Sequence, residues 1–318
     1  MSSQGEQKAA AASPKAPAPI PGGLKFLFGG IAGMGATCIV QPLDLVKTRM
    51  QISGAGGGKK EYENSLDCIK KVVKNEGPLG LYKGIGAALL RQATYTTGRL
   101  GVYTYLQDFY QTTFKRTPGI LDSMGMGIIA GAMGAFIGTP AEVALIRMAS
   151  DGRLPPAERR NYSNVLNALT RITREEGVTA LWRGSIPTMG RAMVVNMTQL
   201  ASYSQFKNYF KNGPLKMDEG IGLHFCSSML SGFLTTITSM PLDIAKTRIQ
   251  NMKTAPGAKP EYSGTIDVLL KVARQEGLFA LWKGFTPYFC RLGPHTVLTF
   301  IFLEQLNKQY REFASRSK

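Results

Sequence analysis

Histidine and cysteine are scarce in this chain of 318 residues. With only two histidines, His224 and His295, a metal site built from several imidazoles is excluded. The four cysteines lie far apart and form no Cys-x-x-Cys pair, which excludes a zinc site or a disulfide framework. No nucleophile stands beside a base, and there is no phosphate-binding loop. We therefore expect a protein that is not an enzyme and that binds no metal and no cofactor.

Acidic residues are also few: 21 Asp and Glu stand against 38 Lys and Arg, for a net charge of +17. Such an excess predicts an anionic partner, which could be nucleic acid, anionic lipid or an anionic solute. A nucleic-acid-binding protein gathers its bases on one exposed face beside aromatic platforms. Here the bases recur between long apolar stretches, so we expect no nucleic-acid partner. The mean hydropathy of −0.06 does not exclude a membrane protein, because helices around a watery cavity have polar inner faces.

Three copies of one unit follow each other along the chain at a spacing of about 100 residues. One motif, Glu-Gly-x4-aromatic-(Lys/Arg)-Gly, begins at Glu76, Glu176 and Glu276. Another, Pro-x-(Asp/Glu), begins at Pro42, Pro140 and Pro241. The copies predict repeats over 23–117, 118–216 and 217–312, between a disordered tail over 1–22 and a short tail over 313–318. The first tail contains no Arg-rich amphipathic targeting helix, so a mitochondrial address would be internal.

Each copy predicts two long helices and one short helix. Apolar stretches with many small residues cover 24–52, 121–149 and 220–251, and second long stretches cover 82–112, 182–211 and 282–312. Short amphipathic segments lie between them at 62–74, 162–174 and 262–274. A membrane span needs about 20 residues, and small residues let helices approach closely in lipid. We expect an all-α membrane protein with six tilted transmembrane helices in a three-fold pseudosymmetric bundle, with both termini on one side.

Charged residues recur inside the predicted spans. Proline lacks the helical donor, so the three motif prolines should kink three helices at the same depth. An acid follows each proline, at Asp44, Glu142 and Asp243, and a base follows one turn later at Lys47 and Lys246. Charges inside a membrane are costly unless they are paired. Pairing between neighbouring repeats would close a pore at that end, whereas static salt bridges at helix ends are the alternative interpretation.

Arg91, Arg191 and Arg291 lie seven residues beyond the last glycine of the first motif, about 10 Å into each second long helix. Guanidinium groups stay charged and bind carboxylates in a two-pronged manner. Reaching toward lipid headgroups could account for one such base, but not readily for three at equal depth. Three arginines that face one axis therefore predict a binding site for a small dianion.

Positions where the copies differ should set selectivity. One turn beyond the arginines stand Tyr95, Val195 and His295, and a further turn on stand Arg99, Gln199 and Thr299. Arg99 suits a second carboxylate, whereas a nucleotide site would favour aromatic and small residues at these places. Tyr95, Gln199 and His295 could equally serve packing or line the pore.

The two motifs, each present three times, resemble the signature of the mitochondrial carrier family over roughly 24–312. The resemblance implies a mitochondrial inner-membrane protein that works as a monomer by alternating access, with both termini facing the intermembrane space. Residues 89–97, 138–148 and 291–305 are similar to members that exchange dicarboxylates, which implies exchange of 2-oxoglutarate for malate or related dicarboxylates. Another dicarboxylate carrier, or an uncoupling-type transporter of anions or protons, remains the alternative.

The resemblance also implies a matrix gate formed by the motif prolines, acids and bases. In it Asp243 pairs with Lys47 and Glu142 pairs with Lys246, and the family's braces beneath these pairs are matched by Gln51 and Gln250. Leu145 occupies the third basic position and Ala149 the third brace position. Asp44 therefore loses its expected partner, and we expect a light gate. Arg147, a further intramembrane base, could hold Asp44 or contact substrate.

At the opposite end the resemblance implies a cytoplasmic gate of Tyr103, Tyr203, Lys207 and Glu304. At most one ion pair, between Lys207 and Glu304, can form there. The resemblance also implies cardiolipin sites where the short helices and the second long helices begin, at Tyr62, Gly84, Tyr162, Gly184, Tyr262 and Gly284. The expected partners are therefore small dicarboxylates and inner-membrane lipid.

Overall fold

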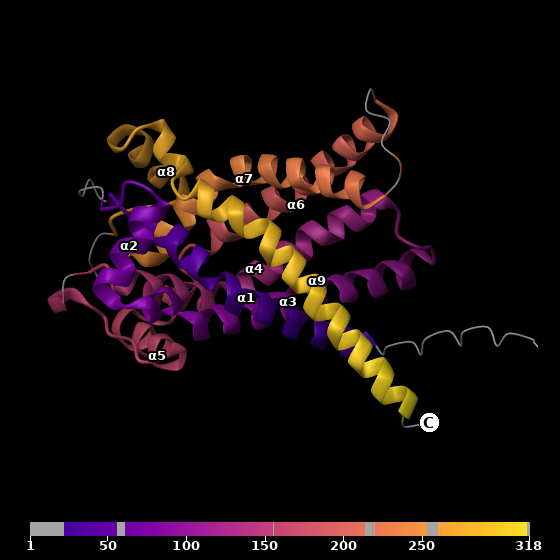
Figure 1. Cartoon of the computed structure of the whole chain (residues 1–318), viewed down its shortest axis with the longest axis horizontal. Helices are drawn as coiled ribbons and strands as arrows, with labels where there is room; N and C mark the ends of the chain where they lie inside the picture. Colours follow the sequence, from indigo (N-terminus) through magenta and orange to yellow (C-terminus); the bar gives the residue numbers. More distant parts are fainter. Residues whose placement is uncertain are drawn as a thin grey trace, which may run out of the picture.

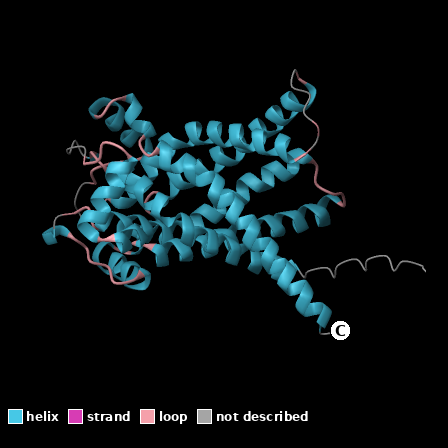
Figure 2. Ribbon diagram, viewed as in Figure 1, coloured by secondary structure: helices cyan, strands magenta, loops and turns pink. Residues whose placement is uncertain are grey.

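The structure is a computed structural model, and it describes residues 22–55, 61–154, 156–213, 218, 220–252 and 260–316. Within these ranges every regular element is a helix (Figure 2). The six long helices are α1 (Gly22–Ile52), α3 (Ile85–Phe114), α4 (Ile120–Asp151), α6 (Ser185–Asn212), α7 (Ile221–Asn251) and α9 (Phe285–Arg316). The three short helices are α2 (Ser65–Glu76), α5 (Val165–Glu176) and α8 (Thr265–Gln275). This long–short–long order occurs three times, and the predicted all-α fold is confirmed.

The ends of the chain differ from the prediction in detail. Gly22, assigned to the N-terminal tail, already belongs to α1, and residues 1–21 lie outside the described residues. Helix α9 continues to Arg316, four residues beyond the predicted end of the third repeat. No glycine or proline after Pro294 interrupts it.

The long helices run side by side along the long axis of the molecule, and α2, α5 and α8 gather at one end (Figure 1). We call this the short-helix end, and we call the opposite end, which carries the C terminus, the far end. Pro42, Pro140 and Pro241 lie inside α1, α4 and α7, and each helix continues through its proline toward the short-helix end. The charged residues that follow the prolines therefore lie near that end.

Large apolar side chains are exposed along the long helices. Ile39, Ile129, Phe225 and Val297 are each more than half exposed. A bilayer solvates such side chains, whereas water does so only at a cost. By length and hydropathy, two of the described helices qualify as candidate membrane spans, Leu27–Ile52 and Leu121–Asp151. The other four long helices are more polar, as expected where inner faces surround a polar site.

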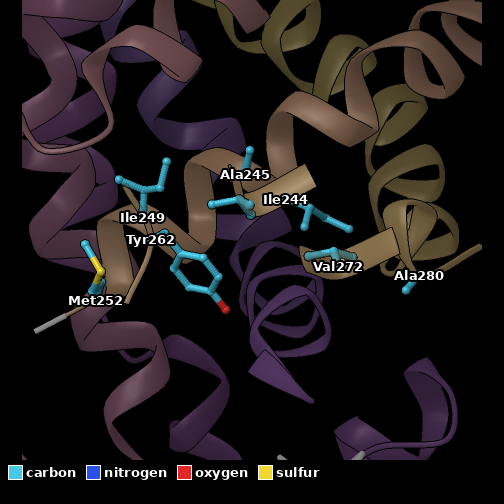
Figure 3. Packing of buried hydrophobic residues seen from close by; sticks show 8 residues of the cluster. Ile244, Ala245, Ile249, Met252, Tyr262, Val272 and Ala280 are labelled. Atoms are coloured by element: carbon cyan, nitrogen blue, oxygen red, sulfur yellow. The ribbon is translucent and has the colours of Figure 1, made fainter. Parts of the chain in front are cut away.

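Each short helix is anchored by a small apolar cluster. In the third repeat, Ile244 of α7 packs with Tyr262 and with Val272 of α8 (Figure 3). In the first repeat, Cys68 and Val72 of α2 are buried in the equivalent place against the end of α1. Burying one such side chain contributes about 1.5–3 kcal/mol. The clusters therefore fix each short helix to the end of the long helix that precedes it.

The short helices begin three residues later than predicted, at Ser65, Val165 and Thr265. Asn64 and Asn164 cap the first two, because their side-chain oxygens accept a backbone N–H from the first turn. The tyrosines that were expected to open these helices precede them instead. Tyr62 and Tyr262 are buried in the apolar clusters, and Tyr162 is half-buried.

Three short 3-10 helices, which the sequence analysis missed, precede the second long helix of each repeat: η2 (Pro78–Tyr82), η4 (Val178–Trp182) and η5 (Leu278–Trp282). A further one, η3 (Pro156–Glu158), lies after α4. The glycine that ends each motif then adopts a left-handed φ between +78° and +83°, at Gly84, Gly184 and Gly284. A Cβ on Gly184 would lie 2.8 Å from the Gln250 side chain. Glycine therefore also lets α6 begin in close contact with α7.

Candidate substrate-binding site and gate

Two ion pairs join neighbouring repeats beyond the prolines. Lys47 of α1 pairs with Asp243 of α7, and the Nζ of Lys246 lies 2.6 Å from an oxygen of Glu142 of α4. All four side chains are at most 10% exposed. These are the two pairs that the sequence predicts, and together with Asp44 we call their residues the gate. Because the pairs are buried, separating either one costs much more free energy than separating a surface ion pair does.

Two glutamines lie beside these pairs at the predicted brace positions. The side-chain N–H of Gln51 donates to Asp243 at 3.2 Å, and the corresponding group of Gln250 donates to Glu142 at 3.4 Å. Gln51 also accepts a hydrogen bond from Thr247 at 2.8 Å. Each brace therefore belongs to a different repeat from the acid that it contacts, and it adds a second bond across the same repeat interface.

The sequence leaves the partner of Asp44 undecided, and the structure supplies one. Nη1 of Arg291 lies 2.7 Å from Oδ1 of Asp44, so α9 supplies the cation that the second repeat does not. Neither of the two roles considered for Arg147 is seen. Its guanidinium binds Glu176 and donates to the backbone carbonyls of Gln250, at 3.1 Å, and Met252, at 2.9 Å. Arg147 is thus a completely buried structural base rather than a gate or substrate residue.

The three symmetric arginines contact the three gate acids. Nη1 of Arg91 lies 4.0 Å from Glu142, and Nε of Arg191 lies 2.5 Å from Asp243, alongside the Arg291–Asp44 pair. Each arginine therefore reaches the acid of the following repeat in a closed cycle. Their side chains have the same exposed fraction, 21%. Equal exposure and equivalent partners place the three guanidinium groups in equivalent surroundings.

A cavity of about 180 Å³ lies between α3, α4, α6 and α7, on the far-end side of the gate. Five of the predicted substrate residues line it: Arg91, Tyr95, Arg99, Arg191 and Gln199. The remaining two, Arg291 and His295, do not line it. Thr188 and Asn196, which the sequence analysis did not assign to any site, and the gate residues Glu142 and Lys246 complete its polar lining. Among the described residues no group of three His, Cys, Asp or Glu side chains could hold a metal ion.

Tyr288 is a site residue that the sequence analysis missed. Its hydroxyl accepts a hydrogen bond from Nη2 of Arg191 at 2.6 Å, and Nζ of Lys47 lies 3.8 Å from the centre of its ring. Both cations also bind Asp243, so Tyr288 orients the two partners of one acid. A signal was available, because the equivalent positions, four residues beyond each motif glycine, hold Ala88 and Thr188.

A second ring of ion pairs surrounds the gate at the short-helix end, and it too was missed. Arg49, Arg147 and Arg248, each seven residues beyond a motif proline, bind the glutamates of the other motif at 76, 176 and 276. The base seven residues after each glutamate binds the same carboxylate, at Lys83, Arg183 and Lys283. Burial raises the pKa of Glu76 and Glu276, but hydrogen bonds from these cations outweigh it and hold both pKa values below their usual range.

The arginines of this ring also bind across repeats. Nε of Arg49 donates to the carbonyl of Ala149 at 2.9 Å, and Nε of Arg248 donates to the carbonyl of Gln51 at 3.2 Å. Arg147 completes the cycle through Gln250. The repeated Glu-Gly and (Lys/Arg)-Gly positions therefore have a structural explanation, because their charged side chains hold these arginines in place.

Tyr103 and Tyr203 are among the residues predicted to form contacts at the far end. The Tyr203 hydroxyl shares a hydrogen bond of 2.6 Å with Nδ1 of His224. Tyr103 is half-buried. The buried ion pairs described above, Lys47 with Asp243 and Lys246 with Glu142, therefore lie at the short-helix end.

The three symmetric tyrosines, which precede the short helices, contact bases of those helices. Lys71, Arg171 and Lys271 of the short helices lie 5.7, 5.1 and 5.4 Å from the ring centres of the three symmetric tyrosines. The buried rings of Tyr62 and Tyr262 face apolar neighbours rather than the surface. The rings of Tyr62 and Tyr262 therefore help to fix the short helices in place.

Comparison with known proteins agrees with this geometry. The chain matches the family described as mitochondrial carrier protein over residues 19–114, 116–214 and 218–313. It is 62% identical over 291 residues, 92% of each chain, to a Homo sapiens protein named mitochondrial 2-oxoglutarate/malate carrier protein. A Caenorhabditis elegans protein of that name is 58% identical over 294 residues, covering 92% of this chain and 95% of the relative. Mitochondrial uncoupling protein 5 of Arabidopsis thaliana is 40% identical over 312 residues, covering 92% and 99%.

The family match covers all three repeats, and each repeat carries the proline, acid and arginine positions from which the site is built. The chain belongs to the mitochondrial carrier family.

Proposed function

We propose that this protein exchanges 2-oxoglutarate for malate or related dicarboxylates across the mitochondrial inner membrane. It does so by alternating access, with the cavity above the gate as the binding site. The name of the human and nematode relatives supports the substrate class. The observation that carries the proposal is the charge of the site.

Cations outnumber acids around the cavity and gate. The ion pairs join five cations to three acids, an excess of two positive charges: Lys47, Arg91, Arg191, Lys246 and Arg291 face Asp44, Glu142 and Asp243. Arg99 adds a further cation to the cavity lining. With Arg99 the excess is three positive charges, so a dicarboxylate, with two negative charges, compensates most of it, whereas a monocarboxylate leaves most of it uncompensated.

This excess favours exchange over leak. An uncompensated charge in a low-dielectric site costs several kcal/mol. An empty carrier would bear that cost for three charges while it changes conformation, whereas a carrier loaded with a dicarboxylate would bear it for one. The physical expectation is that each half-cycle requires a bound dianion, which distinguishes this protein from an uncoupling-type transporter of the same fold.

Within the cavity, Arg91, Arg191 and Arg99 bind the carboxylates of the substrate. Guanidinium groups bind carboxylates through two parallel hydrogen bonds. Asn196 and Gln199 offer neutral hydrogen-bonding groups for the keto or hydroxyl oxygen that separates the two substrates. In this assignment Arg91 and Arg191 give up part of their contact with Glu142 and Asp243 when substrate binds.

Family membership and charge support a proposal for orientation and lipid contacts. The short-helix end faces the matrix, and both termini face the intermembrane space. The first turns of α3, α6 and α9 begin at the motif glycines with backbone N–H groups that lack helical partners, and these groups suit the phosphates of cardiolipin. Three repeats already close a ring, so the protein works as a monomer.

Transport into vesicles tests the proposal. Vesicles loaded with malate should take up labelled 2-oxoglutarate, and empty vesicles should not. Arg191→Ala should abolish uptake, whereas Lys74→Ala, which removes a base from the exposed face of α2, should leave it intact. Equal uptake into empty vesicles would contradict exchange. Both dicarboxylates should also raise the Tm of the purified protein, and nucleotides and amino acids should not.

A further inference from the structure

A groove lies between α1 and α3, the two long helices of the first repeat. At one level the helices touch, because a Cβ on Gly33 would lie 2.6 Å from the Gln92 side chain. Nearer the far end they part, and a Cβ on Gly30 or on Gly101 would meet no described atom within 4 Å. Both of these glycines line the groove, which has a volume of about 630 Å³. We call it the first-repeat groove.

The groove faces away from the cavity that contains the arginines. Leu100, which lines the groove, stands nine residues beyond Arg91, which lines the cavity. Nine residues are about two and a half turns of helix, so the two side chains project from opposite faces of α3. Leu27 and Tyr105 at the groove are 55% and 69% exposed, as bilayer-facing side chains are elsewhere on the long helices. The groove is therefore separate from the site proposed for substrate, and it opens toward lipid.

Of the three repeats, only the first has glycine at both of the open positions. The equivalent residues are Ile128 and Ala201 in the second repeat, and Met229 and Ile301 in the third. A glycine leaves empty the volume that a side chain would take up. The room between α1 and α3 therefore comes from Gly30 and Gly101, and the symmetry of the fold does not require it.

The inner part of the groove is largely apolar. Ile31 and Met34 of α1 and Leu100 of α3 line it. Thr96 also lines it, but its hydroxyl already accepts a hydrogen bond from the Gln92 side chain at 3.2 Å. An acyl chain has no hydrogen-bonding groups, so this lining suits one.

An acid stands at the far-end mouth of the groove. Asp108 lies six residues before the end of α3 at Phe114, is exposed, and forms no ion pair within the described part of the chain. Ala93 lines the inner end of the groove, and from there to Asp108 the helix rises about 22 Å. That rise exceeds half of a hydrocarbon core of about 30 Å. The groove therefore extends from the bilayer interior to the level of the headgroups.

The negative charge at the mouth is specific to the first repeat, because the equivalent residues are Asn208 and Lys308. A carboxylate repels an anionic headgroup and attracts an ammonium group. A primary ammonium also donates hydrogen bonds to it, which a quaternary ammonium cannot do. We propose that the first-repeat groove binds one phospholipid with an ethanolamine headgroup, with an acyl chain between α1 and α3 and the ammonium on Asp108. The site does not depend on the identity of the transported substrate.

Lipid binding to the purified protein in detergent tests the headgroup. The protein is first saturated with cardiolipin, so that added lipid reports on other sites. Phosphatidylethanolamine should then raise the Tm, and native mass spectrometry should show one further bound lipid. Phosphatidylcholine should bind about fivefold more weakly, and Asp108→Asn should reduce the affinity for phosphatidylethanolamine to that level. A wild type that binds both lipids equally well, or an Asp108→Asn variant that keeps the preference, would overturn the proposal.

Filling the groove tests its location. Gly101→Ile, which introduces the residue of the third repeat, should abolish the added binding, and Gly30→Ile should do the same from α1. Since neither Cβ meets a described neighbour, both variants should fold with a ligand-free Tm near that of the wild type. Gly127→Ile, at an equally open position of α4, is the control and should bind the lipid normally. Asn208→Asp adds an acid to a repeat that lacks both glycines and should create no second site. Undiminished binding in both Gly101→Ile and Gly30→Ile would contradict the groove as the site.

Discussion

The indole N–H of Trp282 donates a hydrogen bond of 3.0 Å to the backbone carbonyl of Ile237. Ile237 lies four residues before Pro241, whose missing N–H leaves that carbonyl without its helical donor. Trp282 thus satisfies the backbone group that the proline in α7 leaves unpaired. Its counterpart Trp182 lies against Phe136, with ring centres 6.1 Å apart, but its buried Nε1 has no hydrogen-bond partner among the described residues.

Replacing these tryptophans should therefore have unequal effects. Trp282→Phe leaves the Ile237 carbonyl unpaired and should lower the free energy of unfolding by about 1–2 kcal/mol more than Trp182→Phe does. The two variants remove the same atoms, so each is the control for the other. Thermal unfolding in detergent measures the difference, and equal losses would contradict a role for the hydrogen bond.

Gly152 should not tolerate a side chain. A Cβ at this position would lie 2.0 Å from the Glu76 carboxylate, which belongs to another repeat. Its backbone is in the right-handed helical region, so only the contact opposes substitution. Gly152→Ala should displace Glu76 from Arg49. It should lower the free energy of unfolding by about 1–3 kcal/mol and the Tm by several degrees. Gly86→Ala, at a helical position with no atom within 4 Å, should leave the Tm unchanged or raise it.

The Arg49–Glu76 pair should contribute stability that acid removes. The pKa of Glu76 in the folded protein lies below its ordinary value of 4.5. The contribution is therefore present above pH 4.5 and is lost as the pH falls through the folded pKa. Glu76→Gln leaves Arg49 buried without its charge partner and should cost about 3 kcal/mol at pH 7. The stability of the Glu76→Gln variant should also fall less steeply than that of the wild type as the pH is lowered. Asp67→Asn, which breaks an exposed pair with Lys71 on α2, should change the Tm little.

Cys68 should be inert toward thiol reagents in the folded protein. Burial raises the pKa of its thiol to about 12 from an ordinary value of 9.0. In a variant that carries Cys68 as its one cysteine, raising the pH from 7 to 9 should not accelerate alkylation before unfolding. The raised pKa also means that folding stability falls as the pH rises above about 9, and Cys68→Ala should abolish that fall. Labelling of the folded protein at the rate of the unfolded chain would refute the prediction.

Arg99 should act on affinity rather than on the gate. It lines the cavity but pairs with none of the gate acids among the described residues. Arg99→Gln should raise the KM for 2-oxoglutarate by about tenfold or more, with a smaller change in the maximal exchange rate. Arg99→Lys should recover part of the loss, because it restores charge but not the two-pronged bond. Arg116→Gln, an exposed base near the end of α3, is the control.

The repeated motifs were sufficient to predict the fold. The charged positions recur in the copies, and the cost of buried charge indicates that they pair across repeats. The resemblance to the family supplied the specific partners, Lys47 with Asp243 and Lys246 with Glu142, and the structure forms both pairs. The Arg49, Arg147 and Arg248 positions recur just as regularly. They were missed because the period alone does not reveal which side chains face each other after the chain folds.

Contacts that do not recur in all three repeats were harder to predict from the sequence. The Asp44–Arg291 pair joins residues 247 positions apart, and only the closed ring of helices brings them together. Tyr288 occurs in one copy alone, so no repeat drew attention to it. The 3-10 helices before α3, α6 and α9 were missed because their five-residue length gives no helical periodicity to detect.

The cycle of Arg49, Arg147 and Arg248 has a kinetic consequence. Each repeat donates one of these bonds and accepts another, so a repeat that moved outward alone would break two of the three. Half-open arrangements would then lose most of the hydrogen bonds that full opening loses without giving substrate a path through the gate. They should be sparsely populated. The short-helix end is therefore expected to behave as a cooperative, two-position device. Slippage of small ions such as protons through partly opened intermediates should be rare.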